Sequence, residues 1–182
     1  ALDGRLSPVA GVLPAAIHAQ VNNRNILCPK AQGGEAVWAG DLDVIAPHNL
    51  LELVNHFKGR CLLERPTAIK ATPNSARDTL DLRDIRGQES AKRALEIAAA
   101  GNHNLLLCGP PGAGKSMLAR RLPGILPPLD AYEALEVSMI HSIAGTLPEG
   151  GLMVDRPFRD PHHSASMPAL IGGGHRVRPG EV

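Results

Sequence analysis

One segment in the second half of the chain has the residue types and spacing of a phosphate-binding loop. It consists of Gly109, Pro110, Pro111, Gly112, Ala113, Gly114, Lys115 and Ser116. This run matches G-x-x-x-x-G-K-[ST], the P-loop, in which glycines let backbone N–H groups come close to phosphate oxygens. We expect Lys115 to reach the β- and γ-phosphates and the Ser116 hydroxyl to bind Mg²⁺. The loop therefore predicts binding of a triphosphate together with Mg²⁺.

The segments that flank this loop support the prediction. Residues 104–108 (NLLLC) form an apolar run typical of a buried strand, and we expect Cys108 to be a small buried hydrophobic residue. Residues 117–122 (MLARRL) predict a helix whose first N–H groups and dipole favour an anion. We expect Arg120 and Arg121 to be surface charges on it. Strand, loop and helix in this order are the context that a P-loop requires.

Composition bounds the remaining possibilities. The 182 residues suffice for one ordinary domain or two small ones, and 43% of them are hydrophobic, which is enough for a core. A net charge of +1 gives no global attraction to nucleic acid or membrane, although a local patch stays open. No apolar run approaches the roughly 18 residues of a membrane span, and no signal peptide opens the chain. The 3 cysteines lack metal-type spacing, which predicts reduced thiols in a cytoplasmic protein.

The first 60 residues alternate strand and helix signals. The predicted elements cover residues 1–9 (strand), 13–21 (helix), 25–28 (strand), 35–38 (helix) and 42–46 (strand). A last helix has a plausible N-terminal cap in Asn49 and Glu52 and a plausible stop at Gly59. Its expected buried stripe comprises Leu50, Leu51, Val54 and Phe57.

Residues 61–80 contain prolines and mixed charges without a clear period, which predicts a linker between residues 1–60 and a second unit, residues 81–182. Two further helices are predicted in the second unit from their apolar spacing. The first has an apolar face of Ala91, Ala94, Leu95 and Ala98. The second follows a proline-rich break and has apolar residues at four-residue spacing: Ala131, Leu135, Met139 and Ile143.

Several motifs of the second unit resemble those of AAA+ ATPases. Residues 85–88 (IRGQ) before a helix, the P-loop, and residues 120–129 (RRLPGILPPL) have this character. Residues 156–163 (RPFRDPHH), 169–174 (ALIGGG) and 178–182 (RPGEV) are more specific. Together these residues resemble the bacterial Mg-chelatase-like AAA+ family that includes the competence protein ComM.

The first unit resembles another known domain. Residues 1–9 (ALDGRLSPV) and the helix after them are similar to the second half of a Lon-protease-like domain of the ribosomal S5 domain 2 type. Lon-type peptidases place a lysine at the start of this helix, but no lysine precedes Lys30 here, and Pro14 lies in the matching region. Without a base no serine is activated, so we expect no peptidase activity. The expected fold is α/β: a partial S5 domain 2-like α+β domain, then the first part of an AAA+ αβα domain.

The resemblance implies an ATP-driven motor. Members of the family form homohexameric rings that use ATP and Mg²⁺, and ComM-like members are associated with helicase or branch-migration work on DNA in natural transformation. The resemblance also implies that Ile85 and Gly87 line the adenine pocket and that residues 156–182 form a hairpin facing the ring's pore. Arg176 and Arg178 lie on one face if that segment is extended, and they are our candidates for DNA phosphate contacts, with ordinary surface charge as the alternative.

Catalytic residues are not found in the sequence. ATP hydrolysis needs a Walker B acidic pair and an arginine finger, and no apolar strand ending in Asp-Glu follows Ser116. In this family the Walker B strand is expected soon after residues 180–182, so we expect negligible hydrolysis by this chain alone and ATPase activity in the full-length protein. His162 and His163 would point to opposite faces of a strand, which argues against a metal site.

Two other functions stay open at this stage. One is a Mg-chelatase motor subunit that uses ATP to insert Mg²⁺ into a porphyrin. The other is a non-catalytic module in which ATP binding gates assembly. No membrane partner is expected for any of the three.

Overall fold

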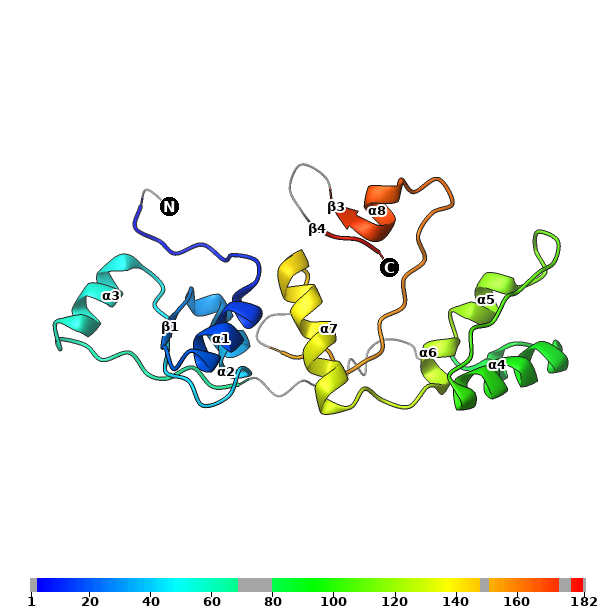
Figure 1. Ribbon diagram of the computed structural model, residues 1–182, viewed down its shortest axis with the longest axis horizontal. Coiled ribbons are helices and arrows are strands. Elements are labelled where there is room, and N and C mark those ends of the chain that lie inside the picture. Colours follow the sequence, from blue (N-terminus) through cyan, green and yellow to red (C-terminus); the bar gives the residue numbers. More distant parts are fainter. Residues whose placement is uncertain (1–2, 69–79, 148–150, 174–177, 182) are drawn as a thin grey trace. The chain divides into compact units, whose positions relative to one another are not determined.

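The computed structural model describes residues 3–68, 80–147, 151–173 and 178–181 (Figure 1). The chain is mixed α/β, and its contacts group it into two compact units. The first, here called the N-terminal unit, comprises the described residues of Ala1–Thr72, Asp130–Val154 and Pro161–Val182. The second, here called the P-loop unit, comprises those of Pro73–Leu129 and Asp155–Asp160.

A pair of parallel strands lies in the core of the N-terminal unit. Strand β1 (Ile26–Leu27) pairs with β2 (Val44–Ile45), and η1 (Lys30–Gln32) and α2 (Gly33–Val37) form the crossover that a parallel pair requires. Helix α1 (Val12–Val21) precedes β1. Their core consists of Val12, Ala16, Cys28, Ala36, Ala39, Leu42, Val44 and Ala46. The helices and strands predicted between residues 13 and 46 are confirmed, whereas the strand predicted over residues 1–9 is reduced to one bridge from Arg5 to Asn49.

Helix α3 (Leu50–Phe57) has the predicted ends but not the predicted burial. The Asn49 side chain accepts a hydrogen bond from the Glu52 amide at 2.9 Å, and Gly59 adopts a left-handed φ of 68° after the last turn. The expected buried stripe is wrong, because Leu51 and Phe57 are each 69% exposed. An amphipathic pattern shows which side chains share one face of a helix, but not whether that face is covered. No described helix or strand makes extensive contacts with the apolar face of α3.

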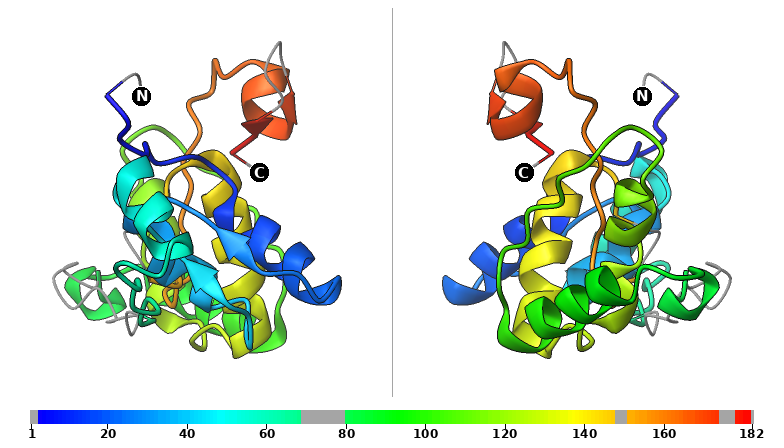
Figure 2. Two further views of the ribbon diagram at one scale, coloured as in Figure 1. Left: turned by 90° about the vertical axis from the view of Figure 1, so that its left-hand side faces the viewer. Right: turned by 90° about the vertical axis from the view of Figure 1, so that its right-hand side faces the viewer.

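Helix α7 (Ala131–Ala144) packs along α1 within the N-terminal unit (Figure 2). It begins with a capping box in which Asp130 accepts the Glu133 amide at 2.8 Å. The helix predicted here is confirmed, and its buried face differs from the apolar row that predicted it. The residues on the buried face are Ala134, Ser138 and Ser142. Small side chains allow close packing, and the Ser138 hydroxyl is satisfied because it donates to the Ala134 carbonyl at 2.6 Å.

The P-loop unit contains η2 (Leu82–Asp84), α4 (Glu89–Gly101), α5 (Lys115–Ala119) and α6 (Leu122–Ile125). The buried face predicted for α4 is confirmed by Leu95 and Ala98. The strand predicted over residues 104–108 is wrong: these residues are not in a strand, Leu106 is 85% exposed, and Cys108 is exposed too. A strand needs a neighbouring backbone to pair with, and no described strand lies beside this segment.

The last part of the described chain contains α8 (Met167–Ile171), followed by β3 (Gly172–Gly173) and β4 (Arg178–Pro179) as an antiparallel pair. None of the helices in the described ranges is both long and apolar enough to span a membrane. The contacts group α7 with the N-terminal unit, whereas the sequence assigned it to residues 81–182. The S5-like assignment and the division at residues 60 and 80 stay predictions.

Candidate phosphate-binding site

The glycine loop leads directly into a helix. Gly112 and Gly114 have φ values of 79° and 82°, a left-handed conformation that favours glycine. Helix α5 then begins at Lys115, two residues before the helix predicted over residues 117–122, with Gly114 as its N-terminal cap residue and no side-chain cap in the described part of the chain. Its first N–H groups are therefore suited to an acceptor from outside the helix.

The Lys115 side chain folds back over the loop. Its Nζ donates to the Gly109 carbonyl at 2.8 Å and to the Pro110 carbonyl at 2.7 Å. An ammonium group, the Ser116 hydroxyl and the first N–H groups of a helix thus lie within one short segment. This donor set fits an anionic phosphate, and the hydroxyl oxygen fits Mg²⁺.

The segment before α4 lies against the P-loop. Ile85 is 2% exposed and packs in a cluster with Leu82, Leu95 and Leu118, the last of which is in α5. Gln88 then donates from Nε2 to the Ala113 carbonyl of the loop at 3.2 Å. The structure therefore brings the segment predicted to bind adenine next to the segment predicted to bind phosphate.

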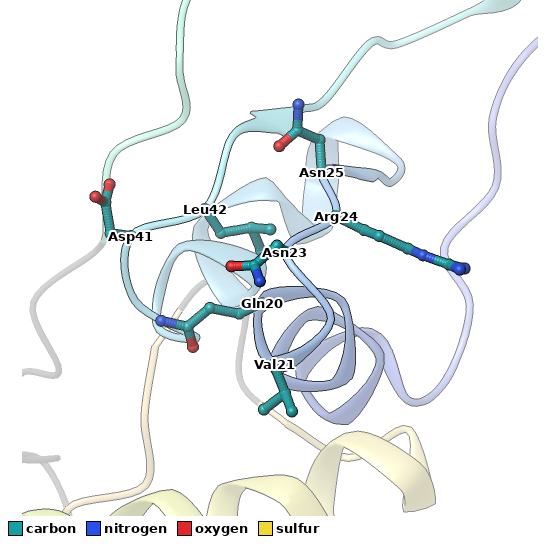
Figure 3. Close-up of a pocket in the computed structure, with 7 residues that line it drawn as sticks. All are labelled: Gln20, Val21, Asn23, Arg24, Asn25, Asp41 and Leu42. Atoms are coloured by element: carbon teal, nitrogen blue, oxygen red, sulfur yellow. The ribbon is translucent and has the colours of Figure 1, made fainter.

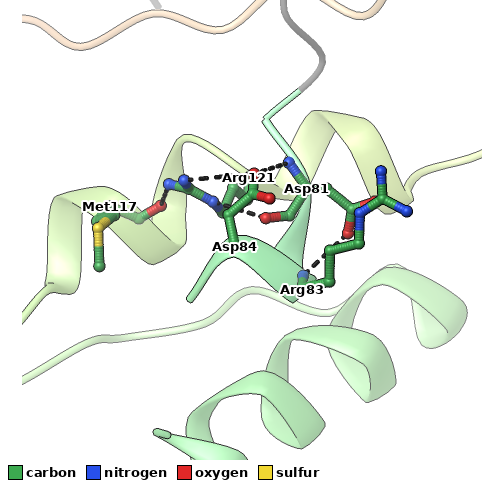
Figure 4. A network of polar contacts seen from close by, with 5 residues as sticks. All are labelled: Asp81, Arg83, Asp84, Met117 and Arg121. Carbon is green, nitrogen blue, oxygen red and sulfur yellow. Dashed lines mark hydrogen bonds and ion pairs between the residues drawn. The ribbon is translucent and has the colours of Figure 1, made fainter. Parts of the chain in front are cut away.

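Arg121 connects the start of the segment before α4 to helix α5 (Figure 4). Its side chain is only 10% exposed, its Nε donates to the Asp81 carbonyl at 2.8 Å, and one Nη donates to the Met117 carbonyl at 2.9 Å. The expectation of a surface charge is wrong for Arg121, because this guanidinium satisfies backbone carbonyls near the end of α5. It holds for Arg120, which is exposed and pairs with Asp160 at 3.0 Å. The helical pattern alone contains no signal that separates these two arginines.

The remaining candidate residues lie elsewhere. Arg176 falls outside the described residues, and Arg178 lies in β4, where its backbone pairs with Gly173. The rings of His162 and His163 are neighbours, with centroids 4.1 Å apart, because this segment is not a strand; the expectation of opposite faces is wrong. Within the described ranges, no group of three or more His, Cys, Asp or Glu residues is arranged to hold a metal ion.

A buried carboxylate in the N-terminal unit was missed by the sequence reasoning. Glu35 is 5% exposed, and its Oε1 accepts the Leu13 amide at 3.0 Å and the hydroxyl of Ser142. Gln32 lies nearby, with Nε2 3.5 Å from the Glu35 carboxylate. Burial, and then the negative charge of Glu35, raise the pKa of the Cys28 thiol from 9.0 to about 11. Because this carboxylate accepts a hydrogen bond from an N–H group in the first turn of α1, we assign it a structural role.

A pocket of about 570 Å³ also lies in the N-terminal unit (Figure 3). The lining residues are Gln20, Val21, Asn23, Arg24, Asn25, Asp41 and Leu42. The Arg24 side chain extends away from the other lining side chains, and Asp41 lies 3.8 Å from Arg65. The P-loop residues do not line it, so we assign it no part in phosphate binding.

Comparison with known proteins gives consistent matches. Residues 81–182 match the family described as magnesium chelatase, subunit ChlI. The whole chain is 46% identical to the competence protein ComM of Haemophilus influenzae and 43% identical to an uncharacterized protein, YifB, of Escherichia coli, and it covers 36% of the length of each. A shorter match, 45% identical over 58 residues, covers 31% of this chain and 9% of the magnesium-chelatase 67 kDa subunit of Heliobacterium mobile.

The chain thus spans about a third of the length of the curated relatives that it matches from end to end. The family match includes the P-loop, the segment before α4 and the C-terminal motifs. These matches agree with the resemblance noted from residues 85–88, 156–163 and 169–174. The chain belongs to the magnesium chelatase subunit ChlI family, and within it to the ComM-like and YifB-like proteins.

Proposed function

We propose that this chain is the nucleotide-binding part of an AAA+ ATPase that binds ATP and Mg²⁺ through residues 109–116. The observation that supports this most is the glycine loop that enters α5 at Lys115, in a chain of this family. The finer proposal is that the full-length protein is a hexameric DNA motor, a helicase or branch-migration enzyme.

Each residue of the loop has a distinct task in this proposal. Gly112 and Gly114 direct backbone N–H groups toward phosphate oxygens. Lys115 exchanges its hydrogen bonds to two loop carbonyls for hydrogen bonds to the β- and γ-phosphates. The new bonds are stronger because the phosphate oxygens are negatively charged. Ser116 is the side chain that would hold Mg²⁺, and the ion when bound neutralises phosphate charge.

The adenine contact is proposed for the backbone of residues 85–87. Because the Ile85 side chain is buried against Leu118, only the main chain at this position is suited to meet a base. Gly87 has a φ of 70° and no side chain, which leaves its backbone accessible.

The proposed action on DNA is supported by the similarity to known proteins. One of them is called a competence protein, which supports a role in natural transformation. We propose Arg176 and Arg178 as contacts to DNA phosphates. The second candidate is a chelatase motor subunit that inserts Mg²⁺ into a porphyrin, and the match to a magnesium-chelatase subunit favours it.

ATPase assays on the full-length protein separate these functions. We expect turnover to be stimulated by branched or single-stranded DNA, and the Lys115→Ala variant to lose it. Stimulation by porphyrin and Mg²⁺ instead of DNA would favour the chelatase function. If nucleotide binding survives Lys115→Ala unchanged, the proposed site is wrong.

A further inference from the structure

Gln88 has an unusual backbone conformation next to the P-loop. It stands immediately before α4 with a φ of 60°, and it follows Gly87, which is also left-handed. A non-glycine residue rarely adopts this conformation, because its Cβ meets the backbone. The Gln88 side chain does not cap α4; its amide instead donates to the Ala113 carbonyl at 3.2 Å.

This bond ties the P-loop to residues 81–88, and a second tie joins the same segment to the region around α5. Arg121 fixes the beginning of this segment through its bond to the Asp81 carbonyl, and its side chain is mostly buried. Gln88 fixes the other end, at a solvent-exposed position beside the glycine loop. Between the two ties, Ile85 packs on Leu118 of α5.

We propose that Gln88 is a positioning residue that sets the distance between the base-binding backbone at residues 85–87 and the phosphate-binding loop. This inference rests on the proposed function and concerns the same purine nucleoside triphosphate. A ligand that spans both segments binds more tightly when the distance between the segments already matches its length. In that case fewer loop and side-chain conformations are lost on binding. A ligand that touches the P-loop alone gains nothing from this match.

The test compares ATP with inorganic tripolyphosphate on the full-length protein, with fluorescent ATP-analogue displacement as the readout. Gln88→Ala and Gln88→Gly remove the amide, and the glycine variant also relieves the left-handed backbone. Gln88→Glu keeps the shape but replaces the donor by an acceptor that faces a carbonyl. We expect each variant to weaken ATP binding about 2- to 10-fold, the effect of one neutral hydrogen bond, and to leave tripolyphosphate binding unchanged.

A matched control stands at the opposite end of the same helix. Asn102 caps the C-terminus of α4 with a φ of 51°, so Asn102→Ala perturbs a left-handed residue that lies away from the loop. We expect this variant to lower the unfolding midpoint and to leave ATP affinity unchanged.

Three results would overturn the inference. They are wild-type ATP affinity in Gln88→Ala, restoration of that affinity by Gln88→Gly, and equal weakening of ATP and tripolyphosphate binding. Lys115→Ala separates this inference from the function itself. If Lys115→Ala leaves both ligands bound, the phosphate site is wrong; if it removes both while the Gln88 variants bind normally, only the role of Gln88 is wrong.

Discussion

Helices α1 and α5 begin in the same backbone conformation but differ in what meets their first N–H groups. Gly11 precedes α1 with a φ of 83°, and Gly114 precedes α5 with a φ of 82°. At α1 a buried carboxylate from Glu35 accepts the Leu13 amide. At α5 the nearest charged side chain of the loop is the ammonium of Lys115.

The difference lies in the sign of the neighbouring charge. The partial positive charge at a helix start is stabilised by an anion. Glu35 supplies that anion from within the chain, so the start of α1 contributes to stability and has no free capacity for a ligand. Lys115 adds positive charge at the start of α5, so that site favours an anion from solution.

The largest effect, a loss of stability, is expected when the buried carboxylate of Glu35 is removed. Glu35→Ala leaves the Ser142 hydroxyl without its buried acceptor and the Leu13 amide with only the Ser142 oxygen at 3.4 Å, which we expect to cost about 2–4 kcal/mol of the free energy of unfolding. Urea titration followed by the fluorescence of Trp38, the single tryptophan, at the end of α2, measures this unit directly. Asp43→Ala, at an exposed position of the same unit, is the control, with an expected change within about 0.5 kcal/mol. A loss below that control would contradict the role of Glu35.

Removing the positive charge at the second helix start should affect binding and not stability. We expect Lys115→Ala to weaken ATP binding about 10- to 100-fold, the range for charge-assisted hydrogen bonds, while the unfolding midpoint stays within error. Isothermal titration calorimetry measures the ATP affinity, and thermal denaturation of the same preparation measures the unfolding midpoint. A large fall in stability would mean that the bonds from Lys115 to Gly109 and Pro110 are structural.

Substitution of Gly11 and Gly114, which precede α1 and α5 in the same conformation, compares the two helix starts most directly. A Cβ at Gly11 or Gly114 meets nothing closer than 3.7 Å, so the cost of Gly11→Ala or Gly114→Ala is that of the left-handed backbone, about 1 kcal/mol in each case. Only Gly114→Ala should also reduce nucleotide affinity. Equal losses of affinity in the two variants would show that the helix starts do not differ in function.

The smallest effect concerns the thiol next to Glu35. Cys28 is buried and has a raised pKa, whereas Cys61 and Cys108 are exposed, so we expect two fast thiols and one slow thiol with a disulfide reagent at pH 8. Because the folded pKa lies above the ordinary value, the stabilising contribution of the neutral thiol is complete below pH 9 and is lost as the pH rises toward 11. Glu35→Gln should bring the Cys28 pKa down toward 9.0. Fast labelling of Cys28 in the folded chain would contradict its burial.

Local signals in the sequence predicted local structure well. The cap at Asn49, the stop at Gly59 and the presence of a helix directly after the glycine loop depend on a few neighbouring residues, and each is confirmed. The P-loop pattern is recognisable for the same reason, since it resides in eight consecutive residues, and nucleotide binding by these residues stays a prediction. What these signals lack is information about partners distant in sequence.

Several of the errors concern such partners. The stripe of α3 and the run at residues 104–108 are apolar, but burial requires a surface to cover them, and a pattern does not supply one. Arg121 and Glu35 are charged residues that are buried because backbone groups far along the chain satisfy them. The buried face of α7 likewise contains two hydroxyl side chains, Ser138 and Ser142, which no pattern in the sequence marked as buried.

The serine face of α7 has a practical consequence for anyone who divides this protein. The family match begins at residue 81, and a fragment cloned from that position would include Ser142 without Glu35. The complementary fragment would retain a buried carboxylate whose hydroxyl donor has been cut away. We therefore expect pieces divided at this boundary to be less stable than the undivided chain, and co-expression of both pieces should restore stability by re-forming the packing of α1 on α7.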